Sequence, residues 1–297
     1  MSDPILEAEG LCFRYVEKNK KNILKNVSTG FQKGKITVLM GASGSGKSTL
    51  LALLAGLYPE NGGVKESGEI LLDGKKIDSY PIPARAEKLS MMFQNADLQF
   101  CMDTLRGEML FCLENISCQP DKMQEKISEA AEKLDMTSLL DRKLHTLSGG
   151  EKQKAALACI YLLGSEIILL DEPFANIDSI WAKRIVNMLS AMNREKKTTI
   201  VAVDHSLDFW LDVVDEIQIL RQDGTVIQGI TRDNLPEKRK LFQQEGLRWP
   251  YEEVTKQKAI PRGPAAIEVR EAQIYAGAGN KKDPEQLLLS DTNALTV

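Results

Sequence analysis

The sequence lacks the features of a disulfide-bonded, zinc-binding or membrane-spanning protein. Its five cysteines are odd in number, scattered and without a CxxC pair, which argues against a disulfide framework and a zinc site. Apolar runs such as residues 50–57 are far shorter than the ~20 residues of a membrane span, and the first ten residues lack the basic-then-apolar order of a signal peptide. We therefore expect a chain of the reducing cytosol.

The chain also lacks a charge excess of either sign. It has 38 basic and 42 acidic residues, interspersed along 297 positions, and a formal net charge of −4. No field of one sign points to a nucleic-acid partner. Hydrophobic residues make up 43% of the chain, which is enough for a buried core in one large domain or two ordinary ones.

A glycine-rich turn after a short apolar run carries the first functional motif. The run Ile36–Met40 is typical of a strand, and an apolar helical pattern follows the turn. The turn matches G-x-x-x-x-G-K-[ST], in which backbone N–H groups and a helix N-terminus bind phosphate, the lysine adds a charge and the hydroxyl can ligate Mg²⁺. The pattern predicts a nucleoside-triphosphate site at residues Gly41, Ala42, Ser43, Gly44, Ser45, Gly46, Lys47, Ser48 and Thr49.

Two carboxylates follow a second apolar run. Residues 167–170 are all apolar, as in a parallel strand buried on both faces, and Asp171 and Glu172 come next, at the edge where open α/β sheets bind ligands. Asp171 is suited to holding Mg²⁺ through water, and Glu172 to polarising an attacking water. The alternative, that both carboxylates only cap the next helix, is weak beside a phosphate loop.

A serine and two glycines open another helical pattern, in the stretch LSGGEKQK. These residues, Ser148, Gly149 and Gly150, form a second anion-binding helix start. Because the phosphate loop already cradles one nucleotide, we expect this second cradle to serve a neighbouring molecule.

The order and spacing of the phosphate loop, LSGGE, LLDEP and a histidine in IVAVDHS resemble the ATP-binding-cassette (ABC) ATPases over about residues 4–230. The resemblance implies a P-loop α/β fold with an antiparallel β subdomain and an inserted α-helical subdomain at about residues 97–147. It also implies a head-to-tail dimer, in which Ser148 and Gly150 of one cassette close over the γ-phosphate bound by the other.

The resemblance also assigns roles to single residues. His205 resembles the switch histidine at the γ-phosphate, and Gln94 resembles the glutamine that contacts Mg²⁺ and water and couples to the membrane partner. Asp178 resembles the aspartate that reaches across the dimer. Tyr15 resembles the aromatic that stacks on adenine, with Phe13 as a rival. The expected catalytic residues are thus Lys47, Gln94, Glu172 and His205, and the expected Mg²⁺ ligands are Ser48, Gln94 and Asp171.

Three positions depart from the family pattern. Ala96 stands where related cassettes often have proline, Asp204 stands where threonine commonly precedes the switch histidine, and Asn176-Ile177 replaces a pairing of a small residue with leucine. None of these changes removes a chemical group that hydrolysis needs. The other histidine, His145, matches no role and is expected at the surface.

Two further segments are similar to the energy-coupling-factor and cobalt-type importers. One is FQNADLQF, with Asp97 and Gln99, which leads into the helical subdomain that contacts the membrane partner in this subgroup. The other is residues 231–264, which resemble the subgroup's helical appendage and end in a polar linker. Between them, alternation around Asp223-Gly224 predicts a β-hairpin.

These features predict an ATP-hydrolysing subunit, cytoplasmic and peripheral at the inner face of the cell membrane, that drives uptake of a vitamin or of a cobalt or nickel ion. Its expected ligands are ATP and Mg²⁺, and its expected partners are a second cassette, a transmembrane coupling subunit and a substrate-binding membrane subunit. One alternative is a soluble tandem-cassette ATPase acting on ribosomes or DNA, which the lack of a basic stripe disfavours. Another is a regulatory module without hydrolysis, which the presence of Glu172 disfavours.

The end of the chain resembles its beginning. Ile267-Glu268 matches Leu6-Glu7 at an offset of 261, and residues 289–292 match residues 24–27 after a four-residue insertion. We therefore expect residues 265–297 to begin a second cassette, and residues 1–230 to be the N-terminal cassette of a tandem protein. The alternative is a disordered tail with accidental similarity.

Overall fold

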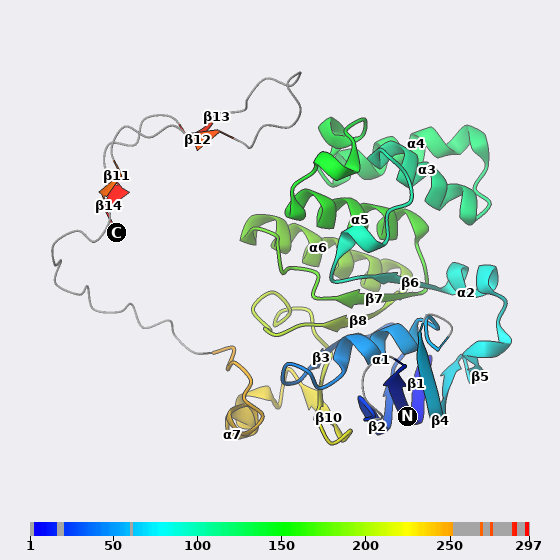
Figure 1. The fold of residues 1–297 in the computed structure, drawn as a ribbon, viewed down its shortest axis with the longest axis vertical. Coiled ribbons are helices and arrows are strands. Elements are labelled where there is room, and N and C mark those ends of the chain that lie inside the picture. The colour runs from blue at the N-terminus through cyan, green and yellow to red at the C-terminus, as the bar shows by residue number, and fades with distance from the viewer. Residues whose placement is uncertain are drawn as a thin grey trace. The chain divides into compact units, whose positions relative to one another are not determined.

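The computed structural model describes residues 3–16, 21–59 and 62–251, together with four short strands beyond them. The chain divides into two compact units, Met1–Pro250 and Tyr251–Val297 (Figure 1). Apart from the four strands, the expected second-cassette start at residues 265–297 lies outside the described residues. The strands are β11 (Glu268–Val269), β12 (Ile274–Tyr275), β13 (Leu287–Leu289) and β14 (Leu295–Thr296).

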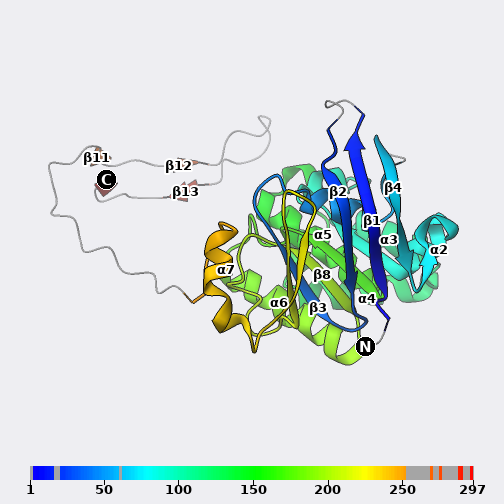
Figure 2. The same cartoon turned by 90° about the horizontal axis from the view of Figure 1, so that it is seen from below.

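Two sheets form the framework of the first unit (Figure 2). An antiparallel sheet has the order β2-β1-β4-β5, and a six-stranded sheet has the order β10-β9-β3-β8-β7-β6, with only β10 running antiparallel to its neighbour. The α/β fold with an antiparallel subdomain is therefore confirmed. The strands are β1 (Leu6–Tyr15), β2 (Leu24–Phe31), β3 (Ile36–Met40), β4 (Gly63–Leu72), β5 (Lys75–Lys76), β6 (Leu89–Met92), β7 (Ile167–Asp171), β8 (Thr199–Val203), β9 (Glu216–Leu220) and β10 (Val226–Thr231).

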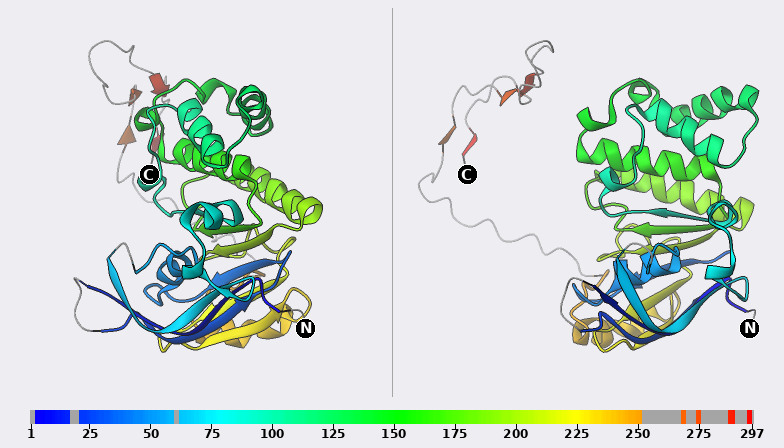
Figure 3. Two further views of the ribbon diagram at one scale, coloured as in Figure 1. Left: turned by 90° about the vertical axis from the view of Figure 1, so that its right-hand side faces the viewer. Right: turned by 45° about the vertical axis from the view of Figure 1, so that its right-hand side comes forward.

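The six-stranded sheet is buried on both faces, because its central strands are apolar at nearly every position. On β3, Ile36 and Val38 lie in the core shared with the large helices, whereas Leu39 lies in the core shared with α1 (Lys47–Leu54) and the antiparallel sheet. This alternation places α1 between the two sheets, as Figure 3 shows. The phosphate-loop helix is thereby fixed from both sides.

Two of the longer helices, α5 and α6, contact the other face of the six-stranded sheet, and α3 and α4 pack on α5 (Figure 1). The helices α3 and α4 form the inserted helical subdomain, within the expected residues 97–147. In the described part of the chain, no helix is both long enough and apolar enough to cross a bilayer. The helices are α3 (Leu105–Asn115), α4 (Pro120–Lys133), α5 (Gly149–Leu163) and α6 (Ser179–Lys196), with the short α2 (Ile82–Lys88) and α7 (Arg239–Gln244) elsewhere.

The segment after the β9–β10 hairpin packs back onto the first unit. The hairpin itself is antiparallel, as predicted around Asp223-Gly224. Beyond it, Leu235, Phe242 and Trp249 are buried in the core that contains the large helices. The appendage up to Pro250 is therefore continuous with the cassette rather than a separate body.

Candidate functional site

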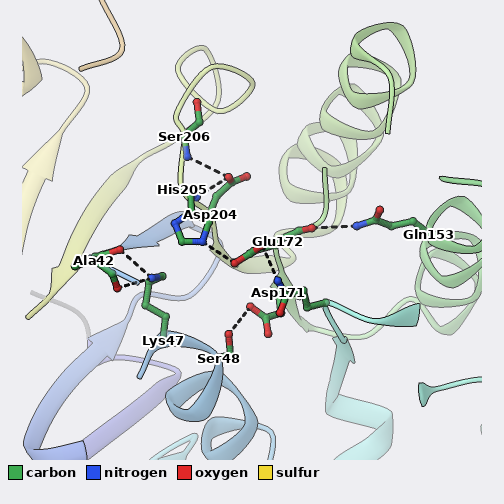
Figure 4. Close-up of polar contacts among 11 residues, drawn as sticks. Ala42, Lys47, Ser48, Gln153, Asp171, Glu172, Asp204, His205 and Ser206 are labelled. Carbon is green, nitrogen blue, oxygen red and sulfur yellow. Dashed lines mark hydrogen bonds and ion pairs between the residues drawn. The ribbon is translucent and has the colours of Figure 1, made fainter. Parts of the chain in front are cut away.

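The expected site residues meet at one edge of the six-stranded sheet, because parallel strands end at the same edge. The phosphate loop follows β3, His205 follows β8, Glu172 follows β7 and Gln94 follows β6, and these strands are neighbours in the order β3-β8-β7-β6. Their side chains converge on a cavity of about 400 Å³ (Figure 4). The cavity is lined by Ile23, Ser43, Gly44, Gly46, Lys47, Ser48, Thr49, Gln94, Glu172 and His205.

The phosphate loop is shaped by glycines that no other residue could replace without strain. Gly41 has a φ of +151°, and a Cβ there would lie 2.3 Å from the Leu220 carbonyl oxygen, so a side chain has no room. Lys47 Nζ donates hydrogen bonds to the carbonyls of Gly41 (2.8 Å) and Ala42 (3.0 Å). Burial lowers the pKa of Lys47, and the nearby Glu172 and Asp171 oppose this shift.

Asp171 and Ser48 bring two side-chain oxygens together between the loop and the acidic strand. The Ser48 hydroxyl donates to Asp171 Oδ1 at 3.0 Å. Burial raises the pKa of Asp171 to about 6, against the opposing hydrogen bond from Ser48, and the charge of Glu172 raises it further. A hydroxyl and a desolvated carboxylate with an amide oxygen nearby, that of Gln94, are the hard donors that suit Mg²⁺.

Glu172 is held from two sides. Gln94 Nε2 donates to Glu172 Oε2 at 2.8 Å. On the other side, His205 Nε2 lies 2.7 Å from Glu172 Oε1, as Figure 4 shows. The backbone of Glu172 has a φ of +48°, which is the left-handed region that non-glycine residues adopt only at a cost. The carboxylate is therefore fixed in place facing the cavity, next to the phosphate loop.

Tyr15 lies beside the cavity but is not among the residues that line it. Its hydroxyl is 2.9 Å from Thr49 Oγ1, and its ring packs edge-on against Phe13 and Tyr58 at centroid distances of 5.2 and 5.5 Å. Phe13 is fully buried and offers no face to a nucleotide base. Of the two aromatic candidates, Tyr15 is the one that could reach a ligand.

The LSGGE segment lies away from this cavity. Ser148 caps α5 by accepting from the Glu151 N–H at 3.3 Å, and Glu151 accepts in return from the Ser148 N–H at 2.8 Å. Ser148 and Gly149 are exposed and Gly150 is half-buried, and none of the three is among the cavity's lining residues in the described part of the chain. The structure therefore does not bring this helix start to the phosphate loop of the same chain.

Asp178 caps the next helix rather than reaching the cavity. Its Oδ1 accepts from the N–H groups of Ile180 (3.1 Å) and Trp181 (3.0 Å), and Lys154 Nζ lies 3.9 Å from its other oxygen. The Trp181 N–H holds the pKa of this exposed carboxyl below its usual range. His145, expected at the surface, is exposed.

Sequence reasoning missed Gln153, which ties the helix α5 to the acidic strand. This side chain is only 2% exposed, donates to the Glu172 carbonyl at 3.0 Å and accepts from the Asn176 N–H at 3.2 Å. Gly150 also allows α5 to lie close to the backbone of Asn176, since a Cβ at this position would lie 2.7 Å from the Asn176 carbonyl oxygen. The available signal was a glutamine on the otherwise apolar, buried face of a helix.

Comparison with known proteins gives consistent matches over the first unit. Residues 24–175 match the family described as ABC transporter. The chain is 37% identical over 245 residues to the putative HMP/thiamine import ATP-binding protein YkoD of Bacillus subtilis, a match that covers 82% of this chain and 43% of that protein. The chain thus spans less than half the length of that relative.

Two shorter proteins are matched over most of their length. The chain is 32% identical to the energy-coupling factor transporter ATP-binding protein EcfA1 of Mesomycoplasma hyopneumoniae, over 80% of this chain and 87% of that protein. The solved structure of CbiO1 from Clostridium perfringens, described as part of the ABC transporter complex CbiONQ, superposes with a TM-score of 0.66 at 27% identity and covers 84% of this chain and 97% of its own.

Proposed function

The chain belongs to the ABC transporter family, and from this we propose that it is the ATP-hydrolysing subunit of an energy-coupling-factor-type importer. In this proposal it drives uptake of a micronutrient, a vitamin or a cobalt or nickel ion, through separate membrane subunits. The observation that carries the proposal is the position of Glu172 between Gln94 and His205, facing the phosphate loop across one cavity. Similarity to EcfA1 and CbiO1 supports the subgroup.

The phosphate loop and the Ser48–Asp171 pair are the proposed sites of ATP and Mg²⁺. Loop N–H groups and Lys47 would hold the phosphates, and Ser48, Gln94 and Asp171 would hold Mg²⁺, which neutralises phosphate charge when bound. The loop fits an anion: the buried Ser45 hydroxyl finds no hydrogen-bond partner among the described residues. The 3.0 Å contact of Ser48 with Asp171 brings two hard oxygen donors to the same place.

Glu172 is the proposed base and His205 the proposed contact to the γ-phosphate. A carboxylate already oriented by two side chains can accept a proton from a water without reorganising first. Gln94 follows β6 and precedes the helical subdomain. In this proposal, a change in the position of Gln94 at the site moves the helical subdomain and thereby the membrane subunits.

A second cassette is the proposed partner of the LSGGE segment. Ser148 and Gly149 are exposed at the start of a helix whose own cavity they do not line, and a helix start with free N–H groups attracts phosphate. The segment is therefore placed to act on a nucleotide held by another copy or another cassette.

The strands of the second unit support a tandem arrangement. In β1 and β2, Phe13 pairs with Leu24; in β12 and β13, Ile274 pairs with Leu289, and these residues lie 261 and 265 positions later, as the sequence match requires. β11 and β14 pair antiparallel in the same way, with a register that differs from β1 and β2 by one residue. We propose that these strands are the first hairpin of a second cassette.

The substitution Glu172→Gln tests the proposed chemistry. It keeps the shape and the contact to the Gln94 side, so ATP should still bind, but turnover should fall by about 10²- to 10⁴-fold because the base is lost. The matched control is Glu166→Gln at the other end of the same strand, where an exposed carboxylate lies 3.8 Å from Lys33; it should change turnover by less than about twofold.

Phosphate release and binding of a fluorescent ATP analogue measure the two properties separately. Hydrolysis by Glu172→Gln within about twofold of the native chain would refute the assigned base. Affinity purification of the native chain from detergent-solubilised membranes should recover a transmembrane subunit; recovery of ribosomes instead would refute the importer.

A further inference from the structure

The loop that carries His205 contains a half-buried carboxylate, that of Asp204, for which the proposed chemistry has no use. Asp204 lies between the end of β8 and His205, and both of its oxygens are engaged. Oδ1 accepts from the backbone N–H groups of His205 (2.7 Å) and Ser206 (3.1 Å), and Oδ2 accepts from the indole Nε1–H of Trp210 (2.9 Å). Figure 4 shows the bonds of Asp204 Oδ1 to the backbone of His205 and Ser206.

Trp210 links this carboxylate to the acidic strand. Its side chain is fully buried, and its ring packs against Phe174 at a centroid distance of 5.1 Å. Phe174 follows Glu172 by two residues, and it also contacts Phe209 at 5.2 Å. One carboxylate therefore joins the backbone turn of His205 to an aromatic cluster that is anchored just after Glu172.

We propose that Asp204 and Trp210 are positioning residues, a brace that holds His205 Nε2 at its 2.7 Å distance from Glu172 Oε1. His205 is exposed, so neighbouring side chains do not fix its ring by packing. Its backbone is fixed by Oδ1 of Asp204, and the position of that oxygen is fixed in turn through Oδ2 and Trp210. The inference rests on the proposed function, because it concerns the turnover of the same site.

A carboxylate suits this place better than the threonine common in related cassettes. A threonine hydroxyl has a single oxygen, whereas Asp204 presents one oxygen to the backbone turn and the other to the indole. Burial raises the pKa of Asp204, and the hydrogen bonds from Trp210, Ser206 and His205 oppose that shift. Three donors thus compensate the desolvated carboxylate in the orientation that the brace requires.

Two substitutions remove the brace. Trp210→Phe keeps an aromatic ring against Phe174 and removes the indole donor, together with part of the volume of a fully buried ring. Asp204→Asn keeps an acceptor for the backbone turn but places an amide N–H₂ group opposite the indole N–H. Each should lower kcat by about 10-fold and leave ATP affinity within about threefold, because the phosphate loop is untouched.

The matched control is Asp208→Asn in the same loop. Its carboxylate is exposed and pairs with Arg248 at 2.9 Å, away from the cavity-lining residues. Turnover of this variant should stay within about twofold of the native chain. A thermal unfolding curve for every variant shows that the assay temperature lies below its transition.

A double-mutant cycle separates positioning from general stability. In a His205→Ala background, Trp210→Phe and Asp204→Asn should have no further effect on turnover, because their effect acts through the histidine. A further loss of about 10-fold in that background would overturn the proposal, as would native turnover in both single variants.

The two histidines of the chain give a readout that does not depend on hydrolysis. With ¹³C-labelled histidine, the Cε1–H resonance of His205, assigned by its disappearance in His205→Ala, should move in Trp210→Phe and Asp204→Asn, while that of His145 stays in place. A resonance that does not move refutes the brace. A resonance that moves in a chain without ATPase activity supports the brace and refutes the proposed function.

Discussion

The cavity at the phosphate loop and the start of helix α5 differ in where their polar groups find partners. In the cavity, Lys47 bonds to backbone carbonyls, Ser48 bonds to Asp171, and Glu172 is bonded by Gln94 and His205. At the helix start, the side chain of Ser148 bonds to Glu151 in a capping box, and Ser148 and Gly149 are exposed. We call the cavity the inward region, because its polar groups bond within the chain. We call the start of α5 the outward region, because Ser148 and Gly149 are exposed.

This difference shows that the chain gathers the phosphate-loop residues around one cavity and leaves the start of α5 exposed, outside the residues that line that cavity. The two regions are nevertheless connected inside the chain. Gln153, one turn after Gly150 on α5, bonds to the backbone of both Glu172 and Asn176. A displacement of the start of α5 would therefore move Gln153 and, through its hydrogen bond, the backbone of Glu172, which lines the chain's own cavity.

The largest effect is expected when the positive charge of Lys47 is removed from the inward region. Lys47→Ala should lower ATP affinity and turnover by about 10²-fold or more, because among the described residues Lys47 is the lysine that lines the cavity. Isothermal titration with ATP measures the affinity, and Lys33→Ala, on an exposed side chain, is the control. Unchanged affinity would mean that the phosphates bind elsewhere.

A substitution in the outward region should lower turnover without preventing ATP binding. Ser148→Arg places a bulky cation at the helix start, so ATP binding should persist while turnover falls by about 10²-fold. If the two regions act across a dimer, a mixture of Lys47→Ala and Ser148→Arg chains should recover roughly a quarter of native turnover, since half of the dimers are mixed and carry one intact site. Phosphate release from the mixture, compared with each variant alone, measures this recovery. If the mixture recovers no turnover, both regions act in the site of a single chain.

Much of the inward region could be predicted from local sequence. The strand Ile36–Met40 and the strand ending at Asp171 are contiguous apolar runs, and glycine spacing defines the loop between strand and helix. The convergence of Gln94, Glu172 and His205 follows from parallel topology, which places the ends of neighbouring strands at one edge.

The contacts that hold these residues could not be predicted from the sequence. Gln153 lies 19 residues before Glu172 and is buried by tertiary packing rather than by any local pattern. Asp204 was visible as a departure from the family, but its partner Trp210 resembles an ordinary core residue until the loop brings the indole N–H within 2.9 Å. Local patterns identify groups that contact a ligand, whereas groups that orient them depend on the folded chain.

Removing the polar side chain of Gln153, which connects the two regions, should lower turnover less than a substitution in either region. Gln153→Leu keeps the volume but leaves the Glu172 carbonyl and the Asn176 N–H without their buried partner, so turnover should fall by about 10-fold with ATP affinity nearly unchanged. Gln124→Leu on the exposed face of α4 is the control. Steady-state kinetics give the split between kcat and KM. A pure rise in KM would mean that Gln153 supports binding and not the position of Glu172.

The smallest effect separates two carboxylates by pH: Asp171 at the inward region, and Asp178, which caps α6 and lies 3.9 Å from Lys154 of α5. The folded-state pKa of Asp171 is raised to about 6, by burial, so the folded chain binds a proton that the unfolded chain has released, and stability falls as pH rises from about 4 to 6. Asp178 has a folded-state pKa lowered by the Trp181 N–H, so its contribution is present at neutral pH and is lost as pH falls. In buffer without magnesium and nucleotide, Asp171→Asn should therefore raise Tm by a few degrees at pH 7.5, whereas Asp178→Asn should lower it slightly. The Asp171 difference should vanish near pH 3, and the Asp178 difference should shrink as pH falls. Calorimetry across this range measures both, and shifts of the same sign would show that the inward carboxylate is not desolvated.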